Sequence, residues 1–463
     1  MFAMNPMTTL SAIRKPGWRT WLPALSLMTV MSAGPALAAL GGDVSSVQKD
    51  RARFKASLQL STAAHHAVHE LKAPTGTTIR EYLTEDGRVF GVTWQGPFTV
   101  TVCVPGTADC QAIDHVLVDT GSSGLRLLAN DGKAGGELSL RLPAVEDVGR
   151  NAIAECYPFL DGFTWGQVQL ADVRIGGETA GGIAIQVIGE AAYPVPDQCL
   201  GFGNDEDTLE GTSGLLANGI LGVGTFVQDC GPACATAGSG NPGVYFACSS
   251  SALGGCVETA VAAGAQVSNP VARFATDDNG VIVELPPVPA GGAPTASGSL
   301  VFGIGTRSNN GLGGAVVIPV DDKGTLTTAF PAQGTRYPQS FIDSGSNGIY
   351  FLSGAATGIP TCTGTGGIER FYCPPSPIVL SAANQGAGGT PTSPVSFSIA
   401  NANALFASNN VAFSNLGGEN AGIPSLHLAA AFDWGLAFFF GRNVFTAIEG
   451  AATPGGTGPY FAY

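Results

Sequence analysis

Charged side chains are scarce in this chain of 463 residues. They make up 12% of the sequence, with 21 lysines and arginines in all. Residues 98–463 hold 11 of these bases against 29 aspartates and glutamates, a net charge of −18. Such a surface repels phosphate, so the composition excludes nucleic acid as a partner. Because 66 glycines and 30 prolines accompany these few charges, we predict a mainly β protein with many tight turns.

Long apolar runs are missing beyond the first forty residues, so we expect no stable membrane span after processing. Within those forty, basic residues precede an apolar run over 21–30, and Ala36-Leu37-Ala38 has the form of a signal-peptidase site. A membrane anchor is the alternative, but Pro23 and Pro35 interrupt a run that is already short for a span of ~20 residues. We predict that 1–38 is a cleaved signal peptide and that the protein is exported, to the periplasm or the exterior.

Cysteine is absent before position 103, but ten cysteines follow, and an even number in an exported chain predicts disulfides. Cys103 and Cys110 flank a Pro-Gly turn, and Cys362 and Cys373 close another short loop. The remaining candidates are Cys156, Cys199, Cys230, Cys234, Cys248 and Cys256. A structural zinc site is the alternative for the last four. Their spacings match no standard zinc pattern and no histidine is nearby, so we expect no metal.

Residues 39–97 differ from the rest, with no cysteine, seven lysines and arginines, and six acids. We predict a small module: a helix over 44–60, then strands over 77–82 and 88–94. The cluster of His65, His66 and His69 suits a solvated loop better than a metal site. The module is a partner domain, a targeting element or an inhibitory prosegment, and the sequence leaves these open.

A short acidic motif occurs twice. Val116-Leu117-Val118-Asp119-Thr120-Gly121-Ser122 and Ser340-Phe341-Ile342-Asp343-Ser344-Gly345-Ser346 both contain two apolar residues, Asp, Thr or Ser, Gly and Ser. Each apolar strand delivers an aspartate to its end, and glycine allows a sharp turn. Thr120 and Ser344 are placed to bond across to the opposite loop, and Ser122 and Ser346 to orient the carboxylates.

Two adjacent carboxylates share one proton, because like charges that close do not both ionise easily. One then acts as a base on water and the other as an acid, without metal or organic cofactor. We predict that Asp119 and Asp343 form this pair, supported by Thr120, Gly121, Ser122, Ser344, Gly345 and Ser346. His115, four residues before Asp119, fits a packed or hydrogen-bonded strand histidine better than a catalytic group.

These motifs resemble the pepsin-like aspartic proteases. Gly219-Ile220-Leu221-Gly222 is similar to the strand that threads beside the first acid loop of that family, and Phe438-Phe439-Phe440-Gly441 to the second such strand. Residues 298–305 are similar to the strand that closes the first lobe. The chain departs from the family at Leu125-Arg126, where Leu-Trp is usual, and at Gly441-Arg442, where Gly-Asp is usual.

The resemblance implies a bilobal fold with lobes over 98–306 and 307–463, and a cleft between them that binds a peptide or protein. It also implies a flap hairpin, with Tyr157, Phe159 and a turn at Asp161-Gly162 as candidates.

Residues 98–463 further resemble an exported bacterial family, domain of unknown function 3443, and 39–97 resembles domain of unknown function 2844. Neither resemblance implies an activity. We therefore keep two hypotheses, an exported aspartic endopeptidase and a non-catalytic binding or envelope protein with the same fold.

Overall fold

The computed structural model describes a defined set of residues, to which every structural statement below refers. They are 51, 57–63, 66–72, 78–83, 89–95, 98–130, 136–159, 162–189, 193–202, 217–249, 255–364, 368–408, 410–420 and 431–463. The predicted signal peptide lies outside them. In this part of the chain, no helix is long and apolar enough to cross a membrane.

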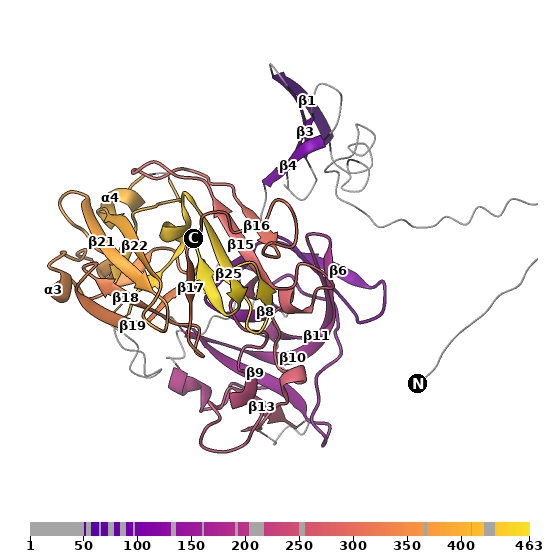
Figure 1. Cartoon of the computed structure of the whole chain (residues 1–463). Coiled ribbons are helices and arrows are strands. Elements are labelled where there is room, and N and C mark those ends of the chain that lie inside the picture. Colours follow the sequence, from indigo (N-terminus) through magenta and orange to yellow (C-terminus); the bar gives the residue numbers. More distant parts are fainter. Residues whose placement is uncertain are drawn as a thin grey trace, which may run out of the picture. The chain divides into compact units, whose positions relative to one another are not determined.

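The N-terminal module contains a four-stranded antiparallel sheet in which each strand pairs with the next (indigo in Figure 1). Its strands are β1 (Ser57–Ala63), β2 (His66–Lys72), β3 (Thr78–Leu83) and β4 (Val89–Gln95). The predicted strand pair corresponds to β3 and β4. The predicted helix is wrong at 57–60, which are part of β1, because Leu58 and Leu60 alternate with polar residues at the period of a strand. Most of the remaining predicted helix, and His65, lie outside the described residues. His66 and His69 lie on β2, so the predicted loop is wrong at these two residues.

A ten-stranded sheet follows, in the order β14-β13-β9-β10-β11-β8-β12-β7, with β5 pairing with both β10 and β6. Its strands are β5 (Val100–Cys103), β6 (Cys110–Ile113), β7 (Val116–Asp119), β8 (Ser123–Leu128), β9 (Ala152–Phe159), β10 (Gly162–Ile175), β11 (Glu178–Ile188), β12 (Gly219–Val223), β13 (Tyr245–Cys248) and β14 (Cys256–Glu258). Every residue of β8 and β12 is buried, including Arg126 of β8.

A seven-stranded sheet belongs to the C-terminal half, in the order β22-β21-β18-β19-β24-β20-β23 (orange to yellow in Figure 1). Its strands are β18 (Leu326–Phe330), β19 (Thr335–Ile342), β20 (Ile349–Phe351), β21 (Ile378–Gln385), β22 (Thr392–Ile399), β23 (Gly417–Glu419) and β24 (Asp433–Trp434). Helices are short: α3 (Gly354–Thr357), α4 (Ala402–Phe406), α5 (Leu436–Phe439), and the 3₁₀ turns η1 (Cys199–Phe202), η3 (Gly231–Ala233), η4 (Ala263–Ala265), η5 (Val271–Arg273) and η6 (Ile368–Arg370).

A five-stranded sheet, ordered β16-β15-β25-β28-β17, joins the two halves of the chain. Its strands are β15 (Gly280–Leu285), β16 (Ser299–Phe302), β17 (Val317–Pro319), β25 (Arg442–Ala447) and β28 (Tyr460–Ala462), and a separate pair is β26 (Ala452–Thr453) with β27 (Gly456–Thr457). The predicted boundary at 306 falls between β16 and β17. The sheet therefore contains strands from both sides of that boundary.

Two large apolar cores lie on either side of the first acid strand. One gathers aliphatic side chains around Leu125 and Leu221, and the other is aromatic, with Phe351 and Trp434 at its centre. Val118, the residue before Asp119, packs against both cores. The first acid is thus held where the cores of the two lobes meet.

All ten cysteines form disulfides. The pairs are Cys103–Cys110, Cys156–Cys199, Cys230–Cys234, Cys248–Cys256 and Cys362–Cys373. The pairing of the four cysteines between 230 and 256 uses up the thiolates that the zinc alternative requires.

Candidate active site

Each acid lies at the end of a strand, beside a second, threaded strand: Asp119 is the last residue of β7, and Asp343 directly follows β19. In the first half, β12 runs parallel to β7 and places Gly222 opposite Asp119. In the second half, β24 runs parallel to β19 and pairs Trp434 with Ile342, the residue before Asp343. The two halves of the chain thus repeat one arrangement of strand, acid loop and threaded strand.

The prediction for the second threaded strand is wrong, because this strand is β24 rather than Phe438-Phe439-Phe440-Gly441. The glycine beside the second acid loop is Gly435, where a Cβ would lie 2.0 Å from the carbonyl oxygen of Gly348. Helix α5 then separates Gly435 from Gly441, which precedes β25. The predicted departure at Gly441-Arg442 therefore does not belong to the acid loop.

Hydrogen bonds lock the two loops together. The Thr120 hydroxyl donates to the carbonyl of Ile342 at 3.1 Å and accepts the backbone N–H of Ser344 at 2.9 Å. In return, the Ser344 hydroxyl donates to the carbonyl of Val118 at 2.7 Å and accepts the backbone N–H of Thr120 at 3.2 Å. Both side chains are buried, so these bonds fix one loop against the other.

We predict that Thr120→Val lowers the free energy of unfolding by about 2–4 kcal/mol, because it leaves the buried N–H of Ser344 and carbonyl of Ile342 without partners. Thr120→Ser keeps the hydroxyl and is the matched control. Urea unfolding measures both variants. Equal stability of the two would contradict the proposed lock.

The first carboxylate accepts two local hydrogen bonds. The backbone N–H of Gly121 donates to Asp119 Oδ1 at 2.8 Å, and the Ser122 hydroxyl donates to Oδ2 at 2.5 Å. These donors fix the plane of the carboxylate, which is buried at 5% exposure.

The second loop repeats this pattern. Gly345 donates its N–H to Asp343 Oδ1 at 2.7 Å, and Ser346 donates its hydroxyl to Oδ2 at 3.0 Å. A Cβ on Gly121 would lie 2.6 Å from the carboxyl carbon of Asp343, and a Cβ on Gly345 would lie 2.9 Å from that of Asp119. Each carboxyl group therefore lies over the glycine of the opposite loop, where only glycine leaves room.

The two acids are electrostatically coupled. Burial raises the pKa of Asp343 well above its usual range, and the charges of Asp119 and Asp433 and a hydrogen bond with Asp119 raise it further. The raised pKa favours the protonated form of Asp343, and Asp119 is the acid beside it.

The flap candidates lie on the hairpin of β9 and β10. Tyr157 and Phe159 are near the end of β9, their rings 5.3 Å apart, and Gly162 begins β10 opposite Phe159. Asp161 lies outside the described residues. Burial raises the pKa of Tyr157, and the charge of Asp119 contributes to the rise. This end of the hairpin therefore lies near enough to Asp119 to feel its charge.

Arg126 was not among the predicted site residues. It is fully buried, its guanidinium carbon lies 3.9 Å from the centre of the Tyr157 ring, and its Nη2 donates to Glu155 at 3.1 Å and Asp229 at 2.7 Å. Tyr245 donates its hydroxyl to the other Asp229 oxygen at 2.7 Å. Burial alone lowers the pKa of Arg126, but the charges of Glu155 and Asp229 raise it above its usual value. This cluster links β8, the hairpin of β9 and β10, and the Cys230–Cys234 loop.

Asp433 was also not among the predicted site residues. It lies on β24 with 0% exposure, and neither carboxyl oxygen has a hydrogen-bond partner among the described residues. The signal was an acid inside the otherwise apolar sequence Ala431-Phe432-Asp433-Trp434.

Buried acids with raised pKa values make the stability of the fold pH-dependent. Burial raises the pKa of Asp433 to about 8 and that of Glu155 well above its usual range. The unfolded chain releases these protons near pH 4, so it binds fewer protons than the folded chain between pH 4 and 8. Stability is therefore present at acid pH and falls as pH rises through the folded pKa values.

We accordingly predict that the melting temperature falls between pH 4.5 and 8.5, and that Asp433→Asn makes the fall shallower. Calorimetry at constant ionic strength measures both slopes, with the exposed Asp322→Asn as control. A melting temperature that rises with pH in this window would refute the prediction.

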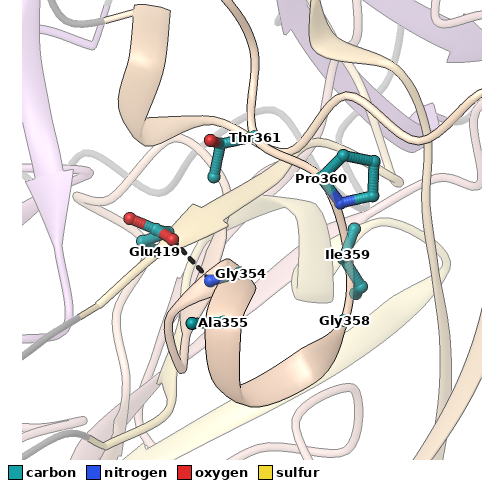
Figure 2. Close-up of a pocket in the computed structure, with 7 residues that line it drawn as sticks. All are labelled: Gly354, Ala355, Gly358, Ile359, Pro360, Thr361 and Glu419. Carbon is teal, nitrogen blue, oxygen red and sulfur yellow. Dashed lines mark hydrogen bonds between the residues drawn. The ribbon is translucent and has the colours of Figure 1, made fainter.

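Two further features lie apart from this chemistry. His115 precedes β7 with φ 50° and is exposed, so it is not packed within a strand. Its ring nitrogen lies 2.7 Å from Asp114 Oδ1, which confirms the expectation of a hydrogen-bonded histidine. A shallow hollow of about 320 Å³ lies beside α3, where the backbone N–H of Gly354 donates to Glu419 (Figure 2). Its lining contains neither acid of the pair.

The paired acid loops, their threaded strands and the two lobes that carry them define a mainly β, bilobal, pepsin-like fold, as predicted. The chain belongs to the family described as protein of unknown function DUF3443, whose model matches residues 90–463. The model of a second family of unknown function, DUF2844, matches residues 36–102.

Among solved structures, the chain is similar to the aspartic proteinase from Irpex lacteus. The two share 17% sequence identity over 79% of this chain and 95% of that one, with a TM-score of 0.44. No curated protein sequence matches the chain.

Proposed function

We propose that the protein is an exported aspartic endopeptidase that hydrolyses peptide bonds with a water molecule activated by Asp119 and Asp343. The observation that carries this proposal is the interlocked pair of carboxyls, each held by a backbone N–H and a serine hydroxyl. A protein that used the fold only for binding would not need two buried acids to share a proton.

The arrangement supports a proton-transfer mechanism. Asp119, as carboxylate, takes a proton from water while the oxygen of that water bonds to the peptide carbonyl carbon. Asp343, which holds the shared proton, donates it to the carbonyl oxygen. When the resulting diol collapses, the C–N bond breaks, Asp119 returns its proton to the leaving nitrogen, and a hydroxyl of the diol returns a proton to Asp343. The pair ends as it began.

The disulfides support the proposal that the protein is exported. Five pairs suit an oxidising compartment, and we propose the periplasm or the exterior, after removal of 1–38. The lobes over 98–306 and 307–463 would hold an extended segment of a peptide or protein substrate.

The test uses the full exported chain and dye-labelled, chemically unfolded casein between pH 3 and 8. We expect internal cleavage that a statine-type inhibitor blocks and that a metal chelator and a serine-directed inhibitor leave unchanged. If purified, folded protein gives no cleavage at any pH, the endopeptidase proposal fails and the binding hypothesis takes its place.

A further inference from the structure

Asp433 lies beside the acid pair by virtue of strand pairing. Strand β24 runs parallel to β19 and places Asp433 opposite Phe341. Residues that pair across parallel strands point to the same face of a sheet, and so do residues two apart in one strand. Asp433 therefore shares the face of Phe341. Asp343 directly follows β19, and its backbone N–H donates to the carbonyl of Trp434 at 3.1 Å, so the acid loop begins beside Asp433.

Among the described residues, Asp433 is buried without a hydrogen-bond donor or a positive side chain to compensate its charge. Its side chain is 0% exposed, and neither oxygen receives a hydrogen bond within the part of the chain that the structure describes. A buried carboxylate without a positive partner is costly, and the group keeps its proton instead.

The groups that face Asp433 are acids and hydroxyls. Strand β20 places Tyr350 opposite it, and the Ser346 hydroxyl, which donates to Asp343, also lies close enough to lower the pKa of Asp433. Asp119 and Asp343 are the charged groups that bear on it. Three carboxyls thus share one buried space, with Ser346 between two of them.

We propose that Asp433 is a third acid of the site, a positioning residue that acts through Ser346 and Asp343 and extends hydrolysis toward neutral pH. This inference rests on the proposed endopeptidase function. At working pH the three carboxyls hold two protons, one on Asp433 and one shared by the pair. When Asp433 gives up its proton, its negative charge raises the pKa of Asp343, so the pair keeps the shared proton to higher pH.

Asp433→Asn tests this assignment because asparagine has the size of aspartate but can neither hold nor release the proton of Asp433. We expect the alkaline limb of the kcat/KM profile to move about one unit toward acid, which is about a tenfold loss on that limb, with little change near pH 4. The exposed Asp322→Asn is the matched control and should leave the whole profile unchanged. A uniform loss at every pH, or no shift, would overturn the assignment.

A second measurement is independent of activity. Selective ¹³C labelling of aspartate carboxyls allows the titration of Asp343 to be followed by NMR, with Asp343→Asn to assign its resonance. Asp433→Asn should lower the midpoint of Asp343, and an unchanged midpoint refutes the coupling even if wild type cleaves no peptide. If Asp433→Asn does not fold, the wild-type spectrum decides. Two coupled carboxyls that titrate above pH 6 support a third acid, and titration of Asp433 below pH 5 overturns it.

Discussion

Replacement of Asp119 or Asp343 by asparagine is expected to lower kcat/KM for peptide hydrolysis by at least about 10³-fold. Loss of a positioned acid or base typically removes a factor of 10² to 10⁴, and here each acid serves in both roles during one turnover. Either substitution also removes the shared proton, because an amide neither accepts it nor gives it up in this pH range. The two single variants should therefore be about as inactive as the double variant.

The controls separate chemistry from folding. Asparagine keeps the size of aspartate, so the contacts of Gly121 and Gly345 with the opposite side chains are preserved. Asp322→Asn makes the same chemical change at an exposed site and should retain full activity. Circular dichroism and urea unfolding verify that each variant is folded. Cleavage by a folded Asp119→Asn variant within tenfold of wild type would exclude this pair as the catalytic machinery.

The acid loops were open to prediction because their interactions are local and occur twice. Asp119 is bonded by residues two and three positions later, and the second loop repeats the same spacing. One short motif therefore specifies its own turn and donors. The bonds between loops span more than 220 residues, but the repetition made their meeting foreseeable.

The rest of the site depends on pairings that leave no local signal. Asp433 lies near the acid pair because β24 pairs with β19, a strand 92 residues earlier in the chain. The backbone N–H of Phe432, for example, donates to the hydroxyl of Ser340. The second threaded strand was misplaced because Gly441 follows an apolar run, as Gly222 does, whereas the short helix α5 intervenes. Pattern alone did not distinguish these two glycines.

Arg126→Met is expected to lower the free energy of unfolding at pH 7 by about 3–5 kcal/mol, the usual result of removing one partner of a buried ion pair. Arg126 bonds Glu155 and Asp229, and all three side chains are 0% exposed. Without the guanidinium, two buried acids remain beside each other with no positive partner. Methionine fills part of the volume of arginine, so the loss of stability comes more from removal of the positive charge than from a cavity.

The pH dependence of this loss identifies its cause. Burial raises the pKa of Glu155 well above its usual range, and loss of the nearby guanidinium raises it further. At acid pH the protonated Glu155 needs no positive partner, so the penalty of Arg126→Met should be smaller there than at pH 7. Arg141→Met, at an exposed position, should cost less than about 0.5 kcal/mol at either pH. A penalty that stays the same from pH 7 to pH 4 would contradict the electrostatic account.

A triple variant completes the argument. Glu155→Gln and Asp229→Asn added to Arg126→Met remove both orphaned charges, and the triple variant should recover part of the stability lost at pH 7. Tyr157 still loses the guanidinium beneath its ring, 3.9 Å from the ring centre in the wild type. If the triple variant regains stability but cleaves peptides more slowly than wild type, Arg126 positions the flap hairpin as well as balancing its charges. If its activity is also wild-type, the cluster serves stability alone.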